Sequence, residues 1–395
     1  MATKPLQGVK VLDFTQLLPG PMCTMHLADM GADVLKFEPP GKGEAARGGG
    51  MGGSGIPQFF MAVNRNKRSL AINLRAPGAR DVVLDLAREA DVLVEGFRPG
   101  VMARLGLGYD DLKAVNPRLV YCAITGYGQD GPFVELGGHD INYQSYAGIL
   151  EQSAPAGGRP HPGNFQIADL AGGALSAAMG ILAALFDARR SGQGRFVDIS
   201  MTDCAMALNI QPLAGFNTYR RTVPAGHDTL TGALPCYGTY ETADGRHLAV
   251  GALEPKFWHA FCEAIDRPDL VKSGWASGKD GVAVKEQLAT LIRSKTLAQW
   301  TGIFAGADAC VSPVLRVDEV LDHPLTKARG MVVQTPMPDG GSVPYYAFPV
   351  KMSDFTFTLD REPPALGQHN EEVLRSLGYD DAALDTLRRD GALPA

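Results

Sequence analysis

The sequence lacks the cysteine patterns and the basic runs that mark several classes of protein. Its 6 cysteines, among 395 residues, form no CxxC pair and no Cys/His cluster at metal-ligand spacing. We therefore expect reduced core thiols, no disulfide framework and no metal site. The formal net charge is −6 and no basic run occurs, which argues against nucleic acid as a partner.

Signatures of membrane insertion and of redox cofactors are also missing. The first nine residues lack the apolar core of a signal peptide, and we identify no uninterrupted apolar run long enough to span a bilayer. No GxGxxG motif follows the first predicted strand, which excludes the usual nicotinamide or flavin fingerprint. We expect a soluble, cytoplasmic protein without a membrane partner or a redox cofactor.

Strands and helices alternate through the first half of the chain. Stretches rich in β-branched residues, separated by helical or glycine-rich segments, occur at 8–14, 33–37, 69–73, 91–95 and 118–125. Such alternation predicts an α/β fold with an open, doubly wound, Rossmann-like parallel sheet. One intervening segment, 41–55, is so rich in glycine that we expect it to be mobile or to wrap a ligand.

The pattern changes from Pro235 onward, where a predicted hairpin and amphipathic helices indicate a smaller α+β domain. We assign residues 1–215 to the large domain and residues 216–330 to an irregular linker and the small domain. Residues 331–395 are expected to form a C-terminal segment that returns to the large domain.

His139 and Asp169 are the candidate acid/base residues. His139 follows a glycine-rich loop and precedes a helix, whereas Asp169 precedes a helix rich in small residues, Leu170–Arg190. A helix start favours negative charge, and imidazole has a near-neutral pKa, so the pair suits proton transfer beside a developing oxyanion. From the residues alone, a simple helix cap at Asp169 and a satisfied polar His139 are an equal alternative.

Several basic residues near the predicted strand ends are candidate phosphate ligands. Each one taken singly is better explained as a solvated surface charge. Because they cluster after the strands, binding of phosphate is the favoured interpretation for three of them. The full set is Lys36, Arg65, Lys67, Arg68, Arg75, Arg98 and Arg104, of which the last three are favoured.

His139 lies in the motif GHDINY, and Asp169 lies in the motif ADLAGG. With these motifs and the segments given below, nearly the whole chain resembles the family III CoA-transferases (the CaiB/BaiF superfamily) and, within them, the α-methylacyl-CoA racemase branch. The aspartate of ADLAGG, Asp169, is shared by both branches, whereas the histidine of GHDINY, His139, is typical of the racemases. Glu254 of GALEPKFW matches a racemase glutamate that supports the histidine. Further matching segments are VLDFTQLLPGPMCTMHLADMGADVLKFEPP, ADVLVEGFRPGVMARLGLGYDDL and PPALGQHNEEVLRSLGY.

The resemblance implies an isomerase that inverts the α-carbon of 2-methylacyl-CoA thioesters through an enolate. His139 would take the α-proton from one face, and Asp169, kept protonated by desolvation, would return a proton to the opposite face. Glu254 would hold His139. The alternative is a CoA-transferase that moves CoA to a carboxylic acid through an acyl anhydride at Asp169; an idle acyl-CoA-binding protein is a third possibility. Coenzyme A is part of the substrate, so no separate cofactor is implied, and an interlocked homodimer is expected.

The resemblance also implies which residues contact the acyl-CoA. Racemases of this type often have an arginine just after the second strand, where this chain has Pro39. Phosphate contacts are then expected from Lys42, Arg75 and Arg104. The complete expected set is Leu74, Arg75, Gly96, Phe97, Arg98 and Arg104 around the nucleotide, and Gly138, Asp140, Asn142 and Tyr143 near the thioester.

Overall fold

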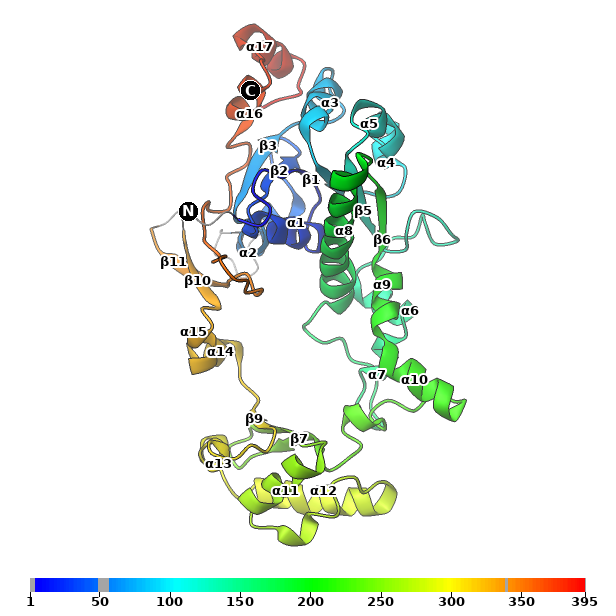
Figure 1. The fold of residues 1–395 in the computed structure, drawn as a ribbon, viewed down its shortest axis with the longest axis vertical. Helices are drawn as coiled ribbons and strands as arrows, with labels where there is room; N and C mark the ends of the chain where they lie inside the picture. The colour runs from blue at the N-terminus through cyan, green and yellow to red at the C-terminus, as the bar shows by residue number, and fades with distance from the viewer. Residues whose placement is uncertain (1–3, 49–56, 338–339, 395) are drawn as a thin grey trace. The chain divides into compact units, whose positions relative to one another are not determined.

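A computed structural model describes residues 4–48, 57–337 and 340–394 of the chain (Figure 1). Its contacts divide the chain into two compact units. The first comprises residues 1–147, 164–208 and 325–395, and the second comprises 148–163 and 209–324. The predicted glycine-rich segment 41–55 lies partly outside the described residues.

The first unit is built on a sheet of parallel strands in the order β3-β2-β1-β4-β5-β6 (Figure 1). This is the doubly wound order, in which the strand sequence reverses between β1 and β4 and ligands bind beyond the carboxyl ends of those strands. The predicted α/β fold is confirmed. The strands are β1 (Lys10–Phe14), β2 (Asp33–Glu38), β3 (Lys67–Ala71), β4 (Val92–Glu95), β5 (Val120–Thr125) and β6 (Phe196–Ser200).

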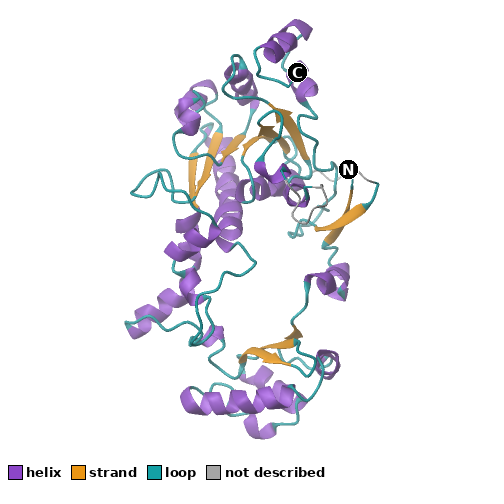
Figure 2. Cartoon of the chain, turned by 180° about the vertical axis from the view of Figure 1, so that it is seen from behind, coloured by secondary structure: helices purple, strands orange, loops and turns teal. Residues whose placement is uncertain are grey.

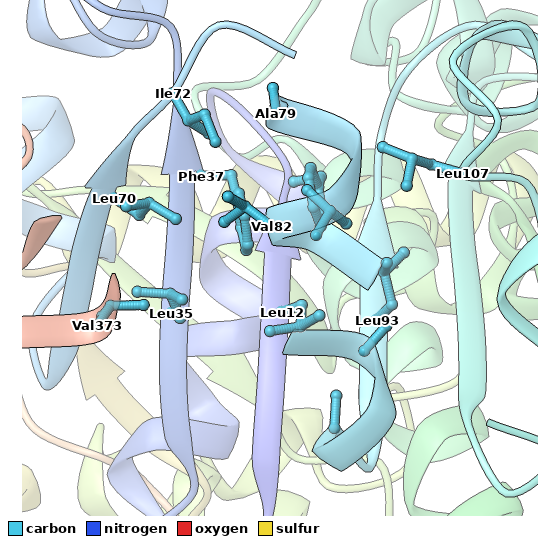
Figure 3. Close-up of a cluster of buried hydrophobic side chains, with 14 of the residues drawn as sticks. Leu12, Leu35, Phe37, Leu70, Ile72, Ala79, Val82, Leu93, Leu107 and Val373 are labelled. Carbon is cyan, nitrogen blue, oxygen red and sulfur yellow. The ribbon is translucent and has the colours of Figure 1, made fainter. Parts of the chain in front are cut away.

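Helices cover both faces of this sheet. On one face, Leu12, Leu35, Leu70 and Leu93 cluster with Val82 of α3 (Figure 3). Side chains alternate along a strand, so Asp13 points to the other face. There its Oδ2 accepts a hydrogen bond from the hydroxyl group of Thr24, in α1. In the first unit, the helices that precede the C-terminal segment are α1 (Pro19–Asp29), η1 (Ala45–Arg47), α2 (Gln58–Val63), α3 (Ala79–Glu89), α4 (Val101–Arg104), α5 (Tyr109–Val115), α6 (Asp140–Tyr146), η2 (Ala168–Leu175), α8 (Ser176–Ser191) and α9 (Met201–Leu208).

The predicted helix at Leu170–Arg190 is present, but it begins earlier and its first turns are wider than an α-helix. Residues 168–175 form the π-helix η2, which continues directly into α8. Small residues bring its backbone close to its neighbours: a Cβ added at Gly172 would lie 2.9 Å from the Met201 carbonyl oxygen. Turns of π-helix are frequent at functional sites.

The expectation that no apolar run could span a bilayer was wrong by length and composition. The continuous helical stretch Ala168–Ser191 has a mean hydropathy of 1.6 in its most apolar window and is long enough to cross a membrane. It also contacts β5, β6 and α1 within the first unit. The central helix of an α/β core passes the same test of length and composition, so this property is weak evidence for membrane insertion.

The C-terminal segment packs against the β3 edge of the first unit. The Asn73 N–H donates to the Ala392 carbonyl at 2.8 Å, and the Ser69 N–H donates to Nδ1 of His369 at 3.2 Å. This segment contributes an antiparallel pair of strands and three helices, and the helix Asn370–Ser376 contacts β3. Its elements are α15 (Pro324–Ala328), β10 (Val332–Pro336), β11 (Ser342–Tyr346), α16 (Asn370–Ser376) and α17 (Asp381–Arg389).

The second unit is a small α+β structure, whose antiparallel sheet β7-β8-β9 is separate from the main sheet (Figure 2). Its core centres on Trp258, Phe261 and Trp300. The expected irregular linker begins instead as a helix, α10. The elements are α7 (Ile149–Gln152), α10 (Ile210–Tyr219), η3 (Thr229–Thr231), β7 (Tyr237–Glu241), β8 (His247–Gly251), α11 (Pro255–Ala264), η4 (Pro268–Leu270), α12 (Gly278–Ile292), α13 (Leu297–Phe304), β9 (Val311–Pro313) and α14 (Val317–Asp322).

Candidate active site

His139 is the residue that precedes α6, and its backbone is fixed from both sides. Its N–H donates to Oδ1 of Asn142 at 3.1 Å, and its carbonyl accepts from the Asn142 N–H at 2.8 Å. The Tyr143 hydroxyl donates to the Gly138 carbonyl at 2.6 Å. The imidazole is exposed, so this loop presents a basic group to solvent or ligand from a rigid backbone.

Asp169 lies in the first turn of η2 and is partly buried. Burial, with a further contribution from the charge of Asp140, raises the pKa of its carboxyl group from 3.8 to about 7. A carboxyl group in such surroundings is protonated over much of the neutral range and can donate a proton as well as accept one.

The carboxylate that binds the start of η2 is Asp140 rather than Asp169. Oδ1 of Asp140 accepts from the N–H groups of Ala168 and Asp169 at 2.8 and 3.0 Å. The sequence suggested that the helix start would favour negative charge at Asp169, whereas the chemistry implied by the resemblance needed a carboxyl group kept protonated by burial. The first expectation was wrong, because Asp140 occupies the N–H donors and its negative charge opposes ionisation of Asp169. The raised pKa agrees with the second expectation.

The structure brings His139 and Asp169 to one cavity of about 200 Å³. The wall of the cavity also includes Gly138, Tyr143 and Gly96, and part of the connection between β1 and α1. This wall lies beyond the carboxyl ends of β1 and β4, where the strand order reverses and doubly wound folds bind ligands. A base and a neutral acid on one cavity can move a proton to and from a single bound group.

Two further cavities share residues with this one. A cavity of about 310 Å³ also contains Gly96, Gly138 and His139, and reaches Phe97 and Arg98. Those two residues also line a larger cavity of about 750 Å³. The three cavities therefore lie next to one another along the carboxyl edge of the sheet.

The largest cavity collects most of the residues expected at the nucleotide. Pro39 lies in its wall, at the position where an arginine was noted as usual. The predicted residues on this cavity are Leu74, Arg75, Phe97, Arg98 and Arg104. Three guanidinium groups on one cavity suit the binding of phosphate oxygens, although that these residues hold CoA stays a prediction. Gly96 lies on the two smaller cavities. Asp140 and Asn142 do not line these cavities, but they accept hydrogen bonds from the backbone N–H groups of Asp169 and His139.

The other basic residues of the predicted set have different partners. Lys36 and Lys67 are fully buried and pair with Glu44 and Asp13. Arg65 is nearly buried and pairs with Asp29. They are therefore neither solvated surface charges nor exposed phosphate ligands. Arg68 pairs with Asp33 and Glu372, and Lys42 is exposed.

Glu254 lies in the second unit, where it precedes α11 and its carbonyl accepts from the Trp258 N–H at 3.1 Å. Its side chain is exposed. His139 belongs to the first unit. The predicted hydrogen bond between Glu254 and His139 therefore stays a prediction.

Sequence reasoning missed two residues that follow β1 and the last residue of β4, Glu95. The residues directly after β4, Gly96 to Arg98, were predicted. Thr15 and Gln16 line the cavity of His139 and Asp169, and their place after β1 in a doubly wound fold could have identified them. Glu95, at the end of β4, accepts from the Phe97 N–H at 2.7 Å, and burial raises its pKa to about 7. This hydrogen bond from the Phe97 N–H to the Glu95 carboxyl group helps to hold Phe97 at the largest of the three cavities.

The fold and the site together indicate an α/β enzyme that has a histidine and an aspartate on one cavity at the carboxyl edge of a doubly wound sheet, with a guanidinium-lined cavity beside it. The chain belongs to the CoA-transferase family III, whose family model matches residues 6–370. The resemblance to the CaiB/BaiF superfamily is thereby confirmed.

Relatives within this family differ in activity. The chain is 36% identical to the alpha-methylacyl-CoA racemase of Homo sapiens, over 98% of this chain and 96% of the relative. It is 32% identical to the succinyl-CoA:glutarate CoA-transferase of Homo sapiens, over 99% of this chain and 90% of the relative. The crystal structure of a CAIB/BAIF family protein from Brucella suis matches with a TM-score of 0.82 and 28% identity, over 95% of this chain and 100% of that chain.

Proposed function

We propose that the protein is a racemase that inverts the α-carbon of 2-methylacyl-CoA thioesters. The observation that carries this proposal is the presence of His139 and Asp169 on one cavity, with the pKa of the Asp169 carboxyl raised to about 7. Inversion needs one group that removes the α-proton and another that returns a proton. An exposed imidazole and a carboxylic acid that is neutral near physiological pH meet that need.

In the proposed reaction, His139 removes the α-proton and the electron pair moves onto the thioester oxygen to give an enolate. Backbone N–H groups at the start of α6, around Asp140, stabilise that oxygen. The Asp169 carboxyl then donates its proton to the opposite face of the α-carbon. The enzyme is left with protonated His139 and ionised Asp169, and the reverse sequence converts the other enantiomer.

The nucleotide of the acyl-CoA would occupy the largest cavity, with its phosphates at Arg75, Arg98 and Arg104. Phe97 and Arg98 line this cavity and the next, which supports a path for the pantetheine arm toward His139. Coenzyme A arrives as part of the substrate in this scheme, so the proposal includes no separate cofactor.

The alternative is a CoA-transferase in which the Asp169 carboxylate attacks the thioester and forms an anhydride. The transferase relatives support this alternative. A pKa near 7 weighs against it, because a protonated carboxyl group is a poor nucleophile. The imidazole of His139 on the same cavity has a direct role only in the racemase scheme.

Isotope exchange distinguishes the two reactions. In deuterium oxide with no acceptor acid, a racemase incorporates deuterium at the α-position of a 2-methylacyl-CoA. A transferase leaves the α-position protonated and gives an acyl-enzyme that hydroxylamine traps. Under the proposal, His139→Ala and Asp169→Ala each lower exchange by about 10²–10⁴-fold. Transfer to an added acid without α-exchange would refute the racemase proposal.

We further propose that the protein works as an interlocked homodimer in the cytoplasm, and that Glu254 supports His139. Exposed apolar side chains on the η2–α8 helix support a dimer: Leu175, Met179 and Phe186 are 51%, 69% and 66% exposed. Apolar side chains concentrated on one exposed element are typical of interfaces. Light scattering coupled to size exclusion measures the mass; a monomer across the working concentration range would contradict the proposal.

A further inference from the structure

The connection between β1 and α1, Thr15–Leu18, is held by buried charged side chains. The Thr15 N–H donates to Oδ1 of Asp13 at 2.9 Å, and the Thr15 carbonyl accepts from Nζ of Lys36 at 2.9 Å. The Leu17 N–H donates to Oε2 of Glu44 at 2.7 Å. Three backbone groups within three residues are therefore bound to charged side chains.

These side chains form one ionic cluster. Nζ of Lys36 lies 3.1 Å from Oε1 of Glu44, and Nζ of Lys67 lies 3.0 Å from Oδ2 of Asp13. Lys67 also donates to the carbonyl of Pro21, just beyond the connection, at 2.9 Å. The four charged side chains are at most 2% exposed and their formal charges sum to zero.

The connection held in this way is also a wall of the cavity that contains His139 and Asp169. Thr15, Gln16 and Leu17 line that cavity, and Gln16 also lines the largest cavity. The backbone at Leu17 is left-handed, with φ 64°, a conformation that leucine rarely adopts. The bond from its N–H to Glu44 is a specific contact that holds it there.

Stability alone gives a weak reason for such a cluster. Burying charges costs solvation, and apolar residues of similar volume often replace a buried ion pair without loss of stability. The charges do, however, provide strong hydrogen bonds with fixed geometry to the backbone groups of the cavity wall.

We propose that Lys36 and Glu44 are positioning residues for the reaction: they fix the Thr15 carbonyl and the Leu17 N–H, and so place Gln16 between the catalytic and nucleotide cavities. They act through the backbone of the connection. The activity part of this inference rests on the proposed function, whereas the structural part concerns the mobility of the connection and can be measured on its own.

The test is the double substitution Lys36→Met with Glu44→Met, which removes both charges and keeps similar side-chain volumes. Hydrogen exchange by NMR, read at the Leu17 amide, should accelerate at least tenfold because its acceptor is gone. The kcat for α-deuterium exchange should fall at least tenfold, with KM for the acyl-CoA changed less than threefold. The melting temperature should stay close to that of the wild type.

A matched control is Asp29→Leu with Arg65→Met, which removes another buried ion pair that lies away from the connection. This control should leave kcat and the exchange rate of the Leu17 amide unchanged. If the Lys36/Glu44 double variant does not fold, Glu44→Gln gives a weaker form of the same test. Its amide oxygen can still accept from the Leu17 N–H, but the bond is no longer charge-assisted. We therefore expect a smaller rise in the exchange rate of the Leu17 amide and a smaller loss of kcat than in the double variant, and a faster exchange rate with an unchanged kcat would overturn the inference.

Two results would overturn the inference. One is an unchanged Leu17 exchange rate in a folded variant that lacks both charges. The other is accelerated exchange with an unchanged kcat. If the enzyme proves to be a transferase, the Leu17 exchange rate is still measurable and kcat is read from CoA transfer, so failure of the proposed function and failure of this inference give different results.

Discussion

Replacement of Asp169 by asparagine should abolish activity and, at neutral to alkaline pH, stabilise the fold. The raised pKa means that the folded protein holds a proton on Asp169 up to pH of about 7, whereas the unfolded chain releases it near 3.8. Below pH 3.8 the carboxyl group is protonated in both the folded and the unfolded state, so it does not lower the free energy of unfolding. Between those values stability falls as pH rises, and above pH 7 the whole cost is present.

The size of this effect follows from the shift. A rise of the Asp169 pKa from 3.8 to about 7 lowers the free energy of unfolding by about 4 kcal/mol at pH 8 and by about 2 kcal/mol at pH 5, at about 1.4 kcal/mol per pKa unit. Both are upper limits, because Asp169 is partly exposed and water screens the interaction. Asp169→Asn keeps the shape of the side chain and removes the charge.

Urea denaturation of the wild type and of Asp169→Asn at pH 5 and pH 8 measures the difference. We expect the variant to gain at least about 1 kcal/mol more at pH 8 than at pH 5. In an Asp140→Asn background the gain should be smaller, since the charge of Asp140 contributes to the raised pKa. An equal effect of Asp169→Asn at both pH values would show that the carboxyl group is not destabilised by burial.

Two further substitutions test the binding cavity and the β1–α1 connection. Arg98→Met with Arg104→Met should raise KM for the acyl-CoA at least tenfold, with less effect at high salt, because two phosphate ligands are lost; an unchanged KM would place the nucleotide elsewhere. Gly20→Ala should lower both stability and kcat, because the new Cβ would lie 2.2 Å from the Thr15 Cβ, whereas Gly48→Ala, whose Cβ would meet only the Ala45 carbonyl oxygen at 3.5 Å, should be tolerated. Melting temperatures and steady-state rates decide between these outcomes.

Most of the sheet could be predicted from the sequence because β1, β2, β4 and β5 are buried on both faces and are rich in Val, Leu and Ile. The alternation of strand and helix then predicts an open sheet of parallel strands, whereas the strand order β3-β2-β1-β4-β5-β6 comes from the structure. Helix α10 was missed because its residues, 210–219, include a proline and a glycine and so have the composition of an irregular segment. The π-helical start of the Asp169 helix has no distinct composition, since its widened turns depend on contacts with α9 and α1.

The candidate acid and base, and burial as the reason for a protonated Asp169, could be proposed from the sequence, but the contribution of Asp140 to the raised pKa could not. Asp140 binds the N–H groups of Ala168 and Asp169 across 28 and 29 residues, a contact that no local pattern reveals. Lys36 and Lys67 were likewise ambiguous, because an isolated lysine is usually at the surface. Only the fold shows that their ammonium groups lie among Asp13, Glu44 and the backbone of the β1–α1 connection.

The two clusters of charge at this site are organised in opposite ways, and their chemistry requires the difference. Asp13 is as buried as a carboxyl group can be, yet the charges of Lys67 and Lys36 and the hydroxyls of Thr15 and Thr24 overcome burial and hold its pKa at about 2. Asp169 is raised to about 7 by burial and by a neighbouring carboxylate. An ion that never changes its charge suits the fixed wall of a cavity, whereas the role proposed for Asp169, exchange of a proton in every turnover, requires a pKa near the pH of the solution. The same edge of the sheet therefore carries both kinds of carboxyl group. Asp13, neutralised by lysines, helps to hold the cavity wall in place, whereas Asp169, which has no such partner charge, keeps a pKa at which it can exchange a proton.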